Sequence, residues 1–164
     1  MVKIGLQISC MFENIEELKT EPNYSYFFKL RCNNCGESDD KWHSICEEER
    51  FQEDTRNPKG FNFVIKCKMC SRDNTIDIVE QSAVSYTEED VGKFKTIVQL
   101  ECRGIEPTAF EPREGFIAKA IDNGNTFENV EIDETGDWAD FDEKNNNSVA
   151  ISEFKSQFVK IKGK

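Results

Sequence analysis

Two short cysteine motifs, CNNC and CKMC, constrain this chain more than any other feature. They pair Cys32 with Cys35 and Cys67 with Cys70, and 31 residues separate the two pairs. Pairs of this kind occur in disulfide frameworks, in thioredoxin-like redox sites and in tetrahedral metal sites. Each alternative requires a different local structure around the cysteines, so the flanking residues discriminate among them.

The disulfide and redox alternatives fit the flanking residues poorly. The chain has 7 cysteines, an odd number, and its 164 residues can bury an adequate core without covalent cross-links. A thioredoxin-like pair must open a helix, whose dipole lowers the thiol pKa. Gly36 directly follows Cys35, and neither motif begins a segment with helical apolar periodicity. We therefore expect neither structure.

A zinc site built from two knuckle-like turns fits better. Apolar, strand-like segments (FFKL and FNFVI) lead into the two motifs, and Gly36 permits the positive φ that such a turn requires. Ser71 occupies the corresponding place in the second turn, which we expect to be less regular. Four thiolates suit tetrahedral zinc, although they also suit iron. The predicted ligands of one Zn²⁺ per chain are Cys32, Cys35, Cys67 and Cys70.

The surroundings of the predicted site differ in charge from the rest of the chain. The segment 47–60 between the pairs is charged and rich in turn-forming residues, so we expect it to form a surface excursion. Four thiolates on Zn²⁺ leave a net negative charge, which nearby cations offset. The basic residues close to the motifs are Lys29, Arg31, Lys66, Lys68 and Arg72.

An internal repeat indicates how the whole chain is organised. KIGLQISC at 3–10 matches KTIVQLEC at 95–102, and NTIDIVE at 74–80 matches NSVAISE at 147–153. Apolar and polar residues alternate along these segments, which indicates strands. The sequence thus predicts an all-β fold of two similar barrel- or sandwich-like halves from an internal duplication. The predicted boundaries are 1–85 for the zinc-binding half, 86–93 for a linker and 94–164 for a metal-free half.

We expect the zinc knuckles in the first half only, with the two halves packed as one compact unit. In the alignment of the halves, Cys32 and Cys35 fall near Asp122 and Asn125, and the segment around the CKMC motif has no counterpart. The linker has room for one helical turn, capped by Thr87.

The other candidate reactive residues have simpler interpretations. Cys10 and Cys102 occupy equivalent places in apolar strands, so we expect both to be buried. Cys46 precedes three glutamates and is interpreted as a spare thiol, and His43, the single histidine, as a surface residue. The acidic segment 133–143 is interpreted as a solvated loop carrying Trp138, with docking of a basic partner surface as the alternative.

The charge balance narrows the classes of partner. With 32 acidic and 21 basic side chains, the net charge of −11 disfavours nucleic acids and anionic membranes as partners.

The N-terminus lacks the long apolar region of a signal peptide, and no stretch approaches the roughly 20 apolar residues of a membrane span. We expect a cytoplasmic, possibly also nuclear, monomer. Motifs of hydrolases, P-loop proteins and dinucleotide-binding enzymes are absent, so we expect no catalytic activity.

Several motifs together resemble a known family. FKTIVQLECRGIEP at 94–107, DWADFDEK at 137–144, and the paired CNNCG and KCKMC are similar to segments of the eukaryotic CXXC-motif-containing zinc-binding proteins. The resemblance spans essentially the whole chain. It implies a small all-β protein of two similar barrel-like halves, with one zinc on the four motif cysteines. It implies no catalytic activity and suggests a role in protein interaction.

These observations favour a non-enzymatic intracellular zinc protein with a structural four-cysteine site that acts as a protein-interaction module. One alternative is a metal-trafficking or thiol-redox protein that uses the two cysteine pairs reversibly. A less favoured alternative is a nucleic-acid-binding zinc ribbon, which only the local basic residues support.

Overall fold

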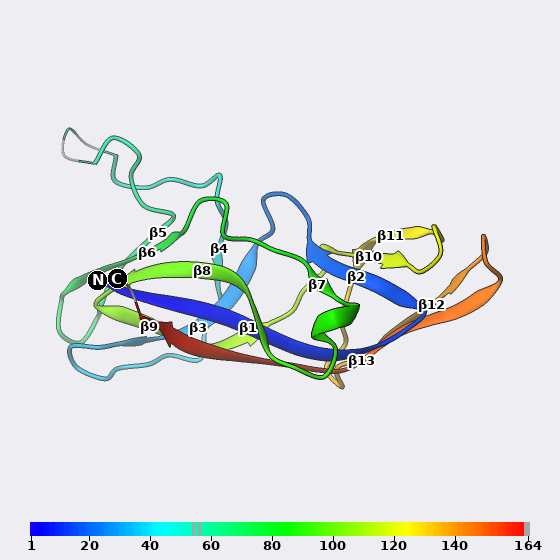
Figure 1. Cartoon of the computed structure of the whole chain (residues 1–164). Helices are drawn as coiled ribbons and strands as arrows, with labels where there is room; N and C mark the ends of the chain where they lie inside the picture. Colours follow the sequence, from blue (N-terminus) through cyan, green and yellow to red (C-terminus); the bar gives the residue numbers. More distant parts are fainter. Residues whose placement is uncertain (54, 56, 163–164) are drawn as a thin grey trace.

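The computed structural model of the protein describes residues 1–53, 55 and 57–162, and most of these residues lie in β-strands (Figure 1). All strand pairs in this part of the chain are antiparallel. The one helical element that it contains is the 3-10 turn η1 (Glu88–Asp90). Across the same residues, no helix is long and apolar enough to cross a membrane. The all-β prediction is confirmed.

The largest sheet has six strands, in the order β12-β13-β1-β8-β6-β5. Its two central strands, β1 and β8, are the segments whose sequences match each other. The beginning of β1 pairs with the end of β13, with Lys3 opposite Ile161, so the first and last strands lie side by side. The strands are β1 (Val2–Glu13), β5 (Phe63–Lys66), β6 (Asp73–Ile78), β8 (Lys95–Arg103), β12 (Trp138–Asp142) and β13 (Asn147–Ile161).

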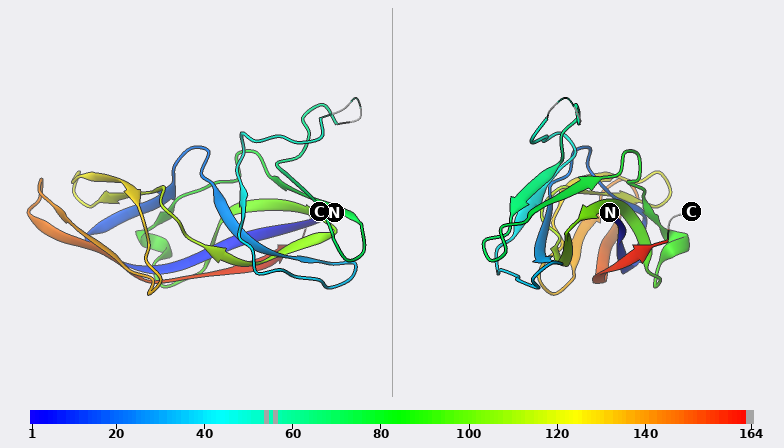
Figure 2. Two further views of the ribbon diagram at one scale, coloured as in Figure 1. Left: turned by 180° about the vertical axis from the view of Figure 1, so that it is seen from behind. Right: turned by 90° about the vertical axis from the view of Figure 1, so that its left-hand side faces the viewer.

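Two smaller sheets complete the fold, and the end-on view in Figure 2 shows the sheets curling around a common interior. One has four strands in the order β11-β10-β2-β7, and the other has three in the order β4-β3-β9. The strands of the four-stranded sheet are β2 (Ile15–Thr20), β7 (Tyr86–Thr87), β10 (Phe116–Ala120) and β11 (Thr126–Val130). Those of the three-stranded sheet are β3 (Tyr26–Cys32), β4 (His43–Ile45) and β9 (Ile105–Glu111).

The order of the strands is symmetric about the β1–β8 pair. On one side of the large sheet β8 is followed by β6 and β5, and on the other side β1 is followed by β13 and β12. Exchanging β1 with β8, and each following strand with its counterpart in the same way, also converts the order β4-β3-β9 into β11-β10-β2 in the smaller sheets. The two ends of the molecule are therefore built from corresponding strands connected in the same way.

A single apolar cluster runs through the interior. Alternation along the strands produces it: in β10, for example, Phe116, Ala118 and Ala120 point inward and are fully buried. Large side chains from the other sheets, Phe28 of β3 and Tyr86 of β7, are also inaccessible to solvent. Complete burial of one such side chain contributes roughly 1.5–3 kcal/mol to stability. The core is thus shared by both ends.

Cys10 and Cys102 belong to this cluster, as predicted. Their exposed fractions are 1% and 2%, and burial raises the pKa of each thiol to about 12. Neither thiol ionises at neutral pH, so both serve as small apolar core residues.

The segment 86–93 is well fixed to the rest of the fold. The buried hydroxyl of Tyr86 accepts a hydrogen bond from the N–H of Cys10 (3.3 Å) and lies 2.6 Å from the carbonyl oxygen of Asp90. The N–H of Thr87 donates to the Asp90 carboxylate (2.8 Å) at the start of η1. The predicted single turn after Thr87 is present, in its 3-10 form.

Two surface predictions had different outcomes. The excursion 47–60 extends from the body in Figure 1, anchored where Phe51 and Phe61 form a β-bridge; its residues 54 and 56 lie outside the described part. The prediction of a solvated loop around Trp138 is wrong for 138–142, which forms β12. The Trp138 ring packs edge-on against the Phe127 ring of β11, with 5.3 Å between the ring centroids. This contact stabilises β12.

Candidate metal centre

The first cysteine pair lies in a tight turn at the end of β3. The N–H of Cys32 donates to the carbonyl of Glu37 (2.9 Å), and the N–H of Gly36 donates back to the carbonyl of Cys32 (2.8 Å). Gly36 has a φ of 78°, the left-handed conformation that glycine adopts without steric cost. The turn predicted from CNNCG is confirmed.

The second pair lies in an equivalent turn between β5 and β6. The N–H of Cys67 donates to the carbonyl of Arg72 (2.9 Å), and the N–H of Ser71 donates to the carbonyl of Cys67 (2.8 Å). Ser71 has a φ of 63°, so it adopts the conformation of Gly36 despite its side chain. We expected a less regular turn, but the two turns have the same hydrogen bonds.

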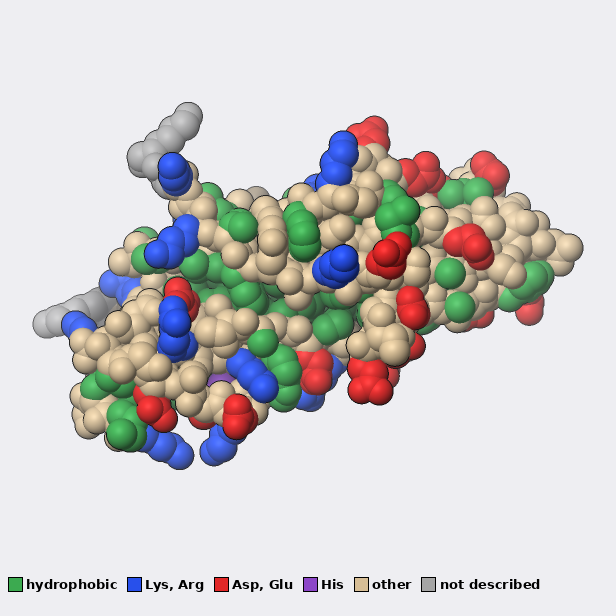
Figure 3. Space-filling view, turned by 90° about the horizontal axis from the view of Figure 1, so that it is seen from below, with side chains coloured by type: hydrophobic (Ala, Val, Ile, Leu, Met, Phe, Trp, Pro, Cys, Tyr) green, Lys and Arg blue, Asp and Glu red, His purple; other side chains and the backbone are tan. Residues whose placement is uncertain are grey.

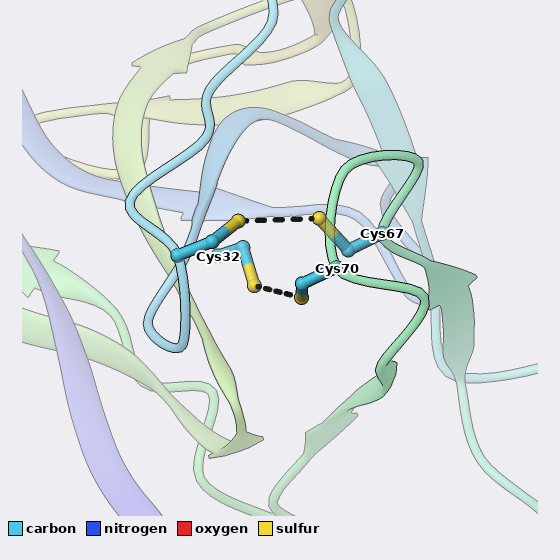
Figure 4. Close-up of side chains that lie close together, drawn as sticks. Cys32, Cys67 and Cys70 are labelled. Carbon is cyan, nitrogen blue, oxygen red and sulfur yellow. Dashed lines mark hydrogen bonds between the residues drawn. The ribbon is translucent and has the colours of Figure 1, made fainter.

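The two turns bring all four motif sulfurs together, and in Figure 4 Cys67 and Cys70 face Cys32 across a short gap. All four Sγ atoms lie within 4.8 Å of one another. The Cys32–Cys70 sulfurs are 3.8 Å apart, and the Cys35–Cys67 sulfurs are 3.5 Å apart. Zinc–sulfur bonds of about 2.3 Å in a tetrahedron imply sulfur separations of about 3.8 Å. The donor set therefore fits one tetrahedral metal ion.

The four cysteine residues differ in their exposure. Cys32 and Cys67 are buried, Cys70 is partly buried and Cys35 is exposed. The cluster thus lies at the surface of the molecule, with Cys35 open to solvent.

Hydrogen bonds and the neighbouring sulfurs shift the thiol pKa values in opposite directions. The backbone N–H groups of Cys35 and Asn34 point at the Cys32 sulfur and, against its desolvation, lower the pKa of Cys32 to about 6. The side chain of Asn34 and the N–H of Arg72 lower the pKa of Cys70. For Cys35, the N–H of Glu37 favours the thiolate, but desolvation and the other three sulfurs raise the pKa to about 12. Four adjacent thiolates therefore require a cation, and Zn²⁺ supplies that charge when bound.

Asn74, at the start of β6, adds a polar contact to the Cys32 sulfur. Its side chain is buried, and its amide N–H donates to Cys32 Sγ at 3.6 Å. In the opposite orientation the amide would donate to the carbonyl of Gly104 at 3.2 Å. A thiolate at Cys32 favours the first orientation, because it accepts hydrogen bonds. Local sequence does not reveal this contact, because Asn74 and Cys32 are 42 positions apart in the chain.

A cavity of about 250 Å³ lies beside the centre, with Leu30, Ile65 and Ile105 among its lining residues. His43 also lines the cavity. The prediction of a surface histidine is wrong, because only 17% of its side chain is exposed. Its ring packs edge-on against Phe63 at 5.4 Å, which explains its burial. Within the described residues, His43 Nε2 has no hydrogen-bond partner, and the nearest acidic oxygen, from Asp39, is 3.5 Å away.

Much of the predicted basic cluster is engaged in local contacts. Lys29 lies over the ring of Trp42 at 5.1 Å, and Arg31 forms an ion pair with Glu106. Arg72 donates to the side-chain oxygen of Asn34 (2.9 Å), which links the two cysteine turns. These groups stabilise the centre and its surroundings, which leaves Lys66 and Lys68 as the exposed lysines on the second turn.

Cys46 takes no part in the centre. Its side chain is buried, its thiol donates to the Glu49 carboxylate (3.2 Å), and burial raises its pKa. The interpretation as a spare thiol is consistent with this position.

The comparison with known proteins identifies the chain. The model of the family "CXXC motif containing zinc binding protein, eukaryotic" matches residues 5–159. The chain belongs to this family. The predicted resemblance is thereby confirmed, and membership makes zinc the metal to consider first at the four sulfurs.

Relatives resemble the chain over nearly its whole length. "UPF0587 protein CG4646" of Drosophila melanogaster is 56% identical, over 99% of both chains. The "CXXC motif containing zinc binding protein" of Homo sapiens is 40% identical, over 98% of this chain and 99% of the human one.

Two solved structures share the fold. "Crystal Structure of C1orf123" has a TM-score of 0.90 at 40% identity and covers 97% of this chain and 99% of its own. A hypothetical protein from Plasmodium falciparum has a TM-score of 0.86 at 22% identity and covers 97% of this chain and 100% of its own. At that identity, the second likeness concerns the fold alone.

Proposed function

We propose that this protein is a non-enzymatic zinc protein, in which one Zn²⁺ per chain is held by Cys32, Cys35, Cys67 and Cys70. The convergence of four sulfurs within 4.8 Å carries the proposal. The match to a zinc-binding family and the fit of the sulfur separations to tetrahedral zinc support it.

The proposed role of the zinc is structural. The first turn extends from β3 of the three-stranded sheet, and the second connects β5 and β6 of the six-stranded sheet. A metal shared by both turns therefore cross-links two sheets at one end of the molecule. Structural zinc contributes roughly 10–16 kcal/mol of apparent binding free energy in small domains. Four protein ligands fill the tetrahedron, so the proposal includes no metal-bound water and no catalysis.

The body of the molecule is proposed to bind another protein. In Figure 3, Lys and Arg side chains gather toward the end with the cysteine turns, and Asp and Glu toward the opposite end. Exposed apolar side chains lie at both ends: Met69 is 69% exposed in the second turn, and Phe141 is 45% exposed in β12. Separated charge and exposed apolar groups are features that recognise complementary protein surfaces.

The internal duplication is also proposed, and three observations support it. First, the strand order is symmetric about β1 and β8. Second, Leu6 and Val98, which the repeat aligns with each other, lie directly opposite in that pair, as residues on a two-fold axis would. Third, the two ends contain a matching backbone hydrogen bond. The N–H of Asn33 donates to the carbonyl of Gly104 (2.9 Å), and at the other end the N–H of Ile121 donates to the carbonyl of Asn14 (3.1 Å).

The zinc proposal is tested by removing one ligand from each turn. Cys32→Ser and Cys67→Ser should each reduce tightly bound zinc from one ion per chain to well below one and lower the melting temperature. Cys46→Ser is the matched control, because its thiol is equally buried but distant from the centre, and it should keep full zinc content. Zinc content is measured by elemental analysis after dialysis. Full zinc retention in both ligand variants would overturn the assignment.

Reversible metal exchange is the second candidate, and the exposure of Cys35 favours it. The rate of zinc transfer to a chromogenic chelator distinguishes the two. Transfer within minutes, under conditions in which hydrogen exchange shows no global unfolding, supports metal exchange. Transfer only at the rate of unfolding supports a structural site.

The interaction proposal is tested by affinity capture from a cytoplasmic extract. A partner retained by the wild type and lost with Lys66→Glu/Lys68→Glu, a variant that should keep its zinc, supports docking at the metal-bearing end. Tight binding of oligonucleotides at physiological salt, with a steep salt dependence, would instead support a nucleic-acid partner.

A further inference from the structure

The end of the molecule without cysteines contains two turns that correspond to the cysteine turns in the symmetric strand order. The turn 120–125 connects β10 and β11, and 32–37 correspondingly begins the connection from β3 to β4. The turn 142–147 connects β12 and β13, as 67–72 connects β5 and β6. The sequence repeat predicts no counterpart for the CKMC segment, whereas the strand order makes 142–147 its counterpart.

One local feature of each turn supports the correspondence, although 120–125 has its positive φ values at Asp122 and Asn123 and not at its fifth residue. The N–H of Ala120 donates to the carbonyl of Asn125 (3.0 Å), the same five-residue closure that Cys32 and Cys67 make. The turn 142–147 has a positive φ of 55° at Asn146, its fifth residue, where the second cysteine turn has Ser71. Asp142 and Asn145 thus stand at the first and fourth positions, which cysteines occupy in the metal-bearing turns.

The side chains at these two positions connect the turns directly. Asp142 is 1% exposed, and its Oδ1 accepts hydrogen bonds from the N–H of Asn125 and the N–H of Lys144, both at 3.1 Å. Its Oδ2 accepts from the side chain of Asn145 (3.1 Å), whose Nδ2 also donates to the carbonyl of Ile121 (2.9 Å). Both side chains therefore bond to the opposite turn as well as to their own.

Gly124 makes this arrangement possible. A Cβ atom at this position would collide with the Asp142 carboxylate and would also lie 2.7 Å from the Cβ of Ala120. The first turn can approach the carboxylate only because residue 124 has no side chain.

We infer that the buried Asp142 carboxylate, with Asn145, joins the two turns of the cysteine-free end in the way that the metal joins the two cysteine turns. The inference rests on the proposed duplication. One end is thus held by metal–thiolate bonds and the other by charge-assisted hydrogen bonds, which need no metal. Metal loss should then loosen one end and leave the other intact.

Hydrogen exchange of individual amides tests this with two opposite perturbations. In Asp142→Asn, the amides of Asn125 and Lys144 should exchange about tenfold faster or more, because each loses a bond to a buried charge. The amides of Cys32 and Cys67 should be unchanged. Removing the metal from the wild type with a chelator should accelerate exchange of the Cys32 and Cys67 amides and leave the Asn125 and Lys144 amides unchanged.

Two further variants keep the test decisive. Asp140→Asn is the matched control, because Asp140 lies on the same strand but is exposed, and it should change none of the four amides. Asn145→Ala removes part of the cluster at lower cost and should accelerate the Asn125 and Lys144 amides less than Asp142→Asn does. Two results would overturn the inference. One is unchanged exchange of the Asn125 and Lys144 amides in both Asp142→Asn and Asn145→Ala. The other is equal loosening of both ends by the chelator. If the wild type held no metal, the proposed function would fail, while the Asp142 results would still decide the inference.

Discussion

Leu6 and Val98 lie directly opposite each other in the β1–β8 pair, and neither side chain is accessible to solvent. The two strands come from opposite halves of the chain and form the middle of the largest sheet. Packing at this pair therefore connects the two ends of the molecule, and it should determine how cooperatively they unfold.

Leu6→Ala should lower the free energy of unfolding by about 2–5 kcal/mol, because it leaves a cavity at the centre of the shared core. Urea unfolding followed by circular dichroism measures the change. Met11→Ala, on the same strand but 40% exposed, is the control and should cost less than about 1 kcal/mol. A similar cost for the two variants would contradict the position of Leu6 in the core.

Asn74→Ala should weaken zinc binding although Asn74 is not a ligand. Its amide donates to the Cys32 sulfur, and loss of such a partner typically lowers metal affinity about 10–100-fold. Competition with a chelator of known affinity measures the effect. Asn145→Ala is the matched control, since it removes an equivalent amide at the cysteine-free end and should leave zinc affinity unchanged. Equal zinc affinity in all three proteins would show that the Asn74 contact has no effect.

Asp90 should contribute stability at neutral pH and lose that contribution in acid. Although partial burial opposes it, Lys95 at 2.9 Å and the Thr87 N–H hold the pKa of Asp90 below its usual value. A depressed folded-state pKa stabilises the folded chain above the unfolded pKa, and the benefit disappears as the pH falls through the folded-state value. Asp90→Asn should therefore lower the melting temperature at pH 7 and have little effect near pH 2. The control Glu88→Gln, in the same turn, should have little effect at either pH.

The sequence predicts the convergence of the four motif cysteines well because the relevant constraints are local. Two CxxC motifs, strand-like approaches and Gly36 specify two turns of known geometry, and zinc chemistry requires that the turns meet. Leu6 and Val98 are buried as the alternation of apolar and polar residues predicts, since alternation along a strand determines which residues point inward.

Other features depend on contacts between distant segments, and local pattern does not encode them. Asp142 lies in a run of acidic residues that resembles a solvated loop, yet it is buried because Asn125 and Asn145 complete its hydrogen bonds. His43 has polar neighbours in sequence but is covered by Phe63, 20 positions further along the chain. The pairing of β1 with β13 joins strands at opposite ends of the sequence.

X-ray absorption at the zinc edge, measured on the protein as purified, tests the central claim most directly. We expect four sulfur neighbours at about 2.3 Å and no nitrogen or oxygen neighbour, because the four motif cysteines complete a tetrahedron. A nitrogen or oxygen neighbour at about 2.0–2.2 Å, or fewer than four sulfurs, would contradict a closed structural site.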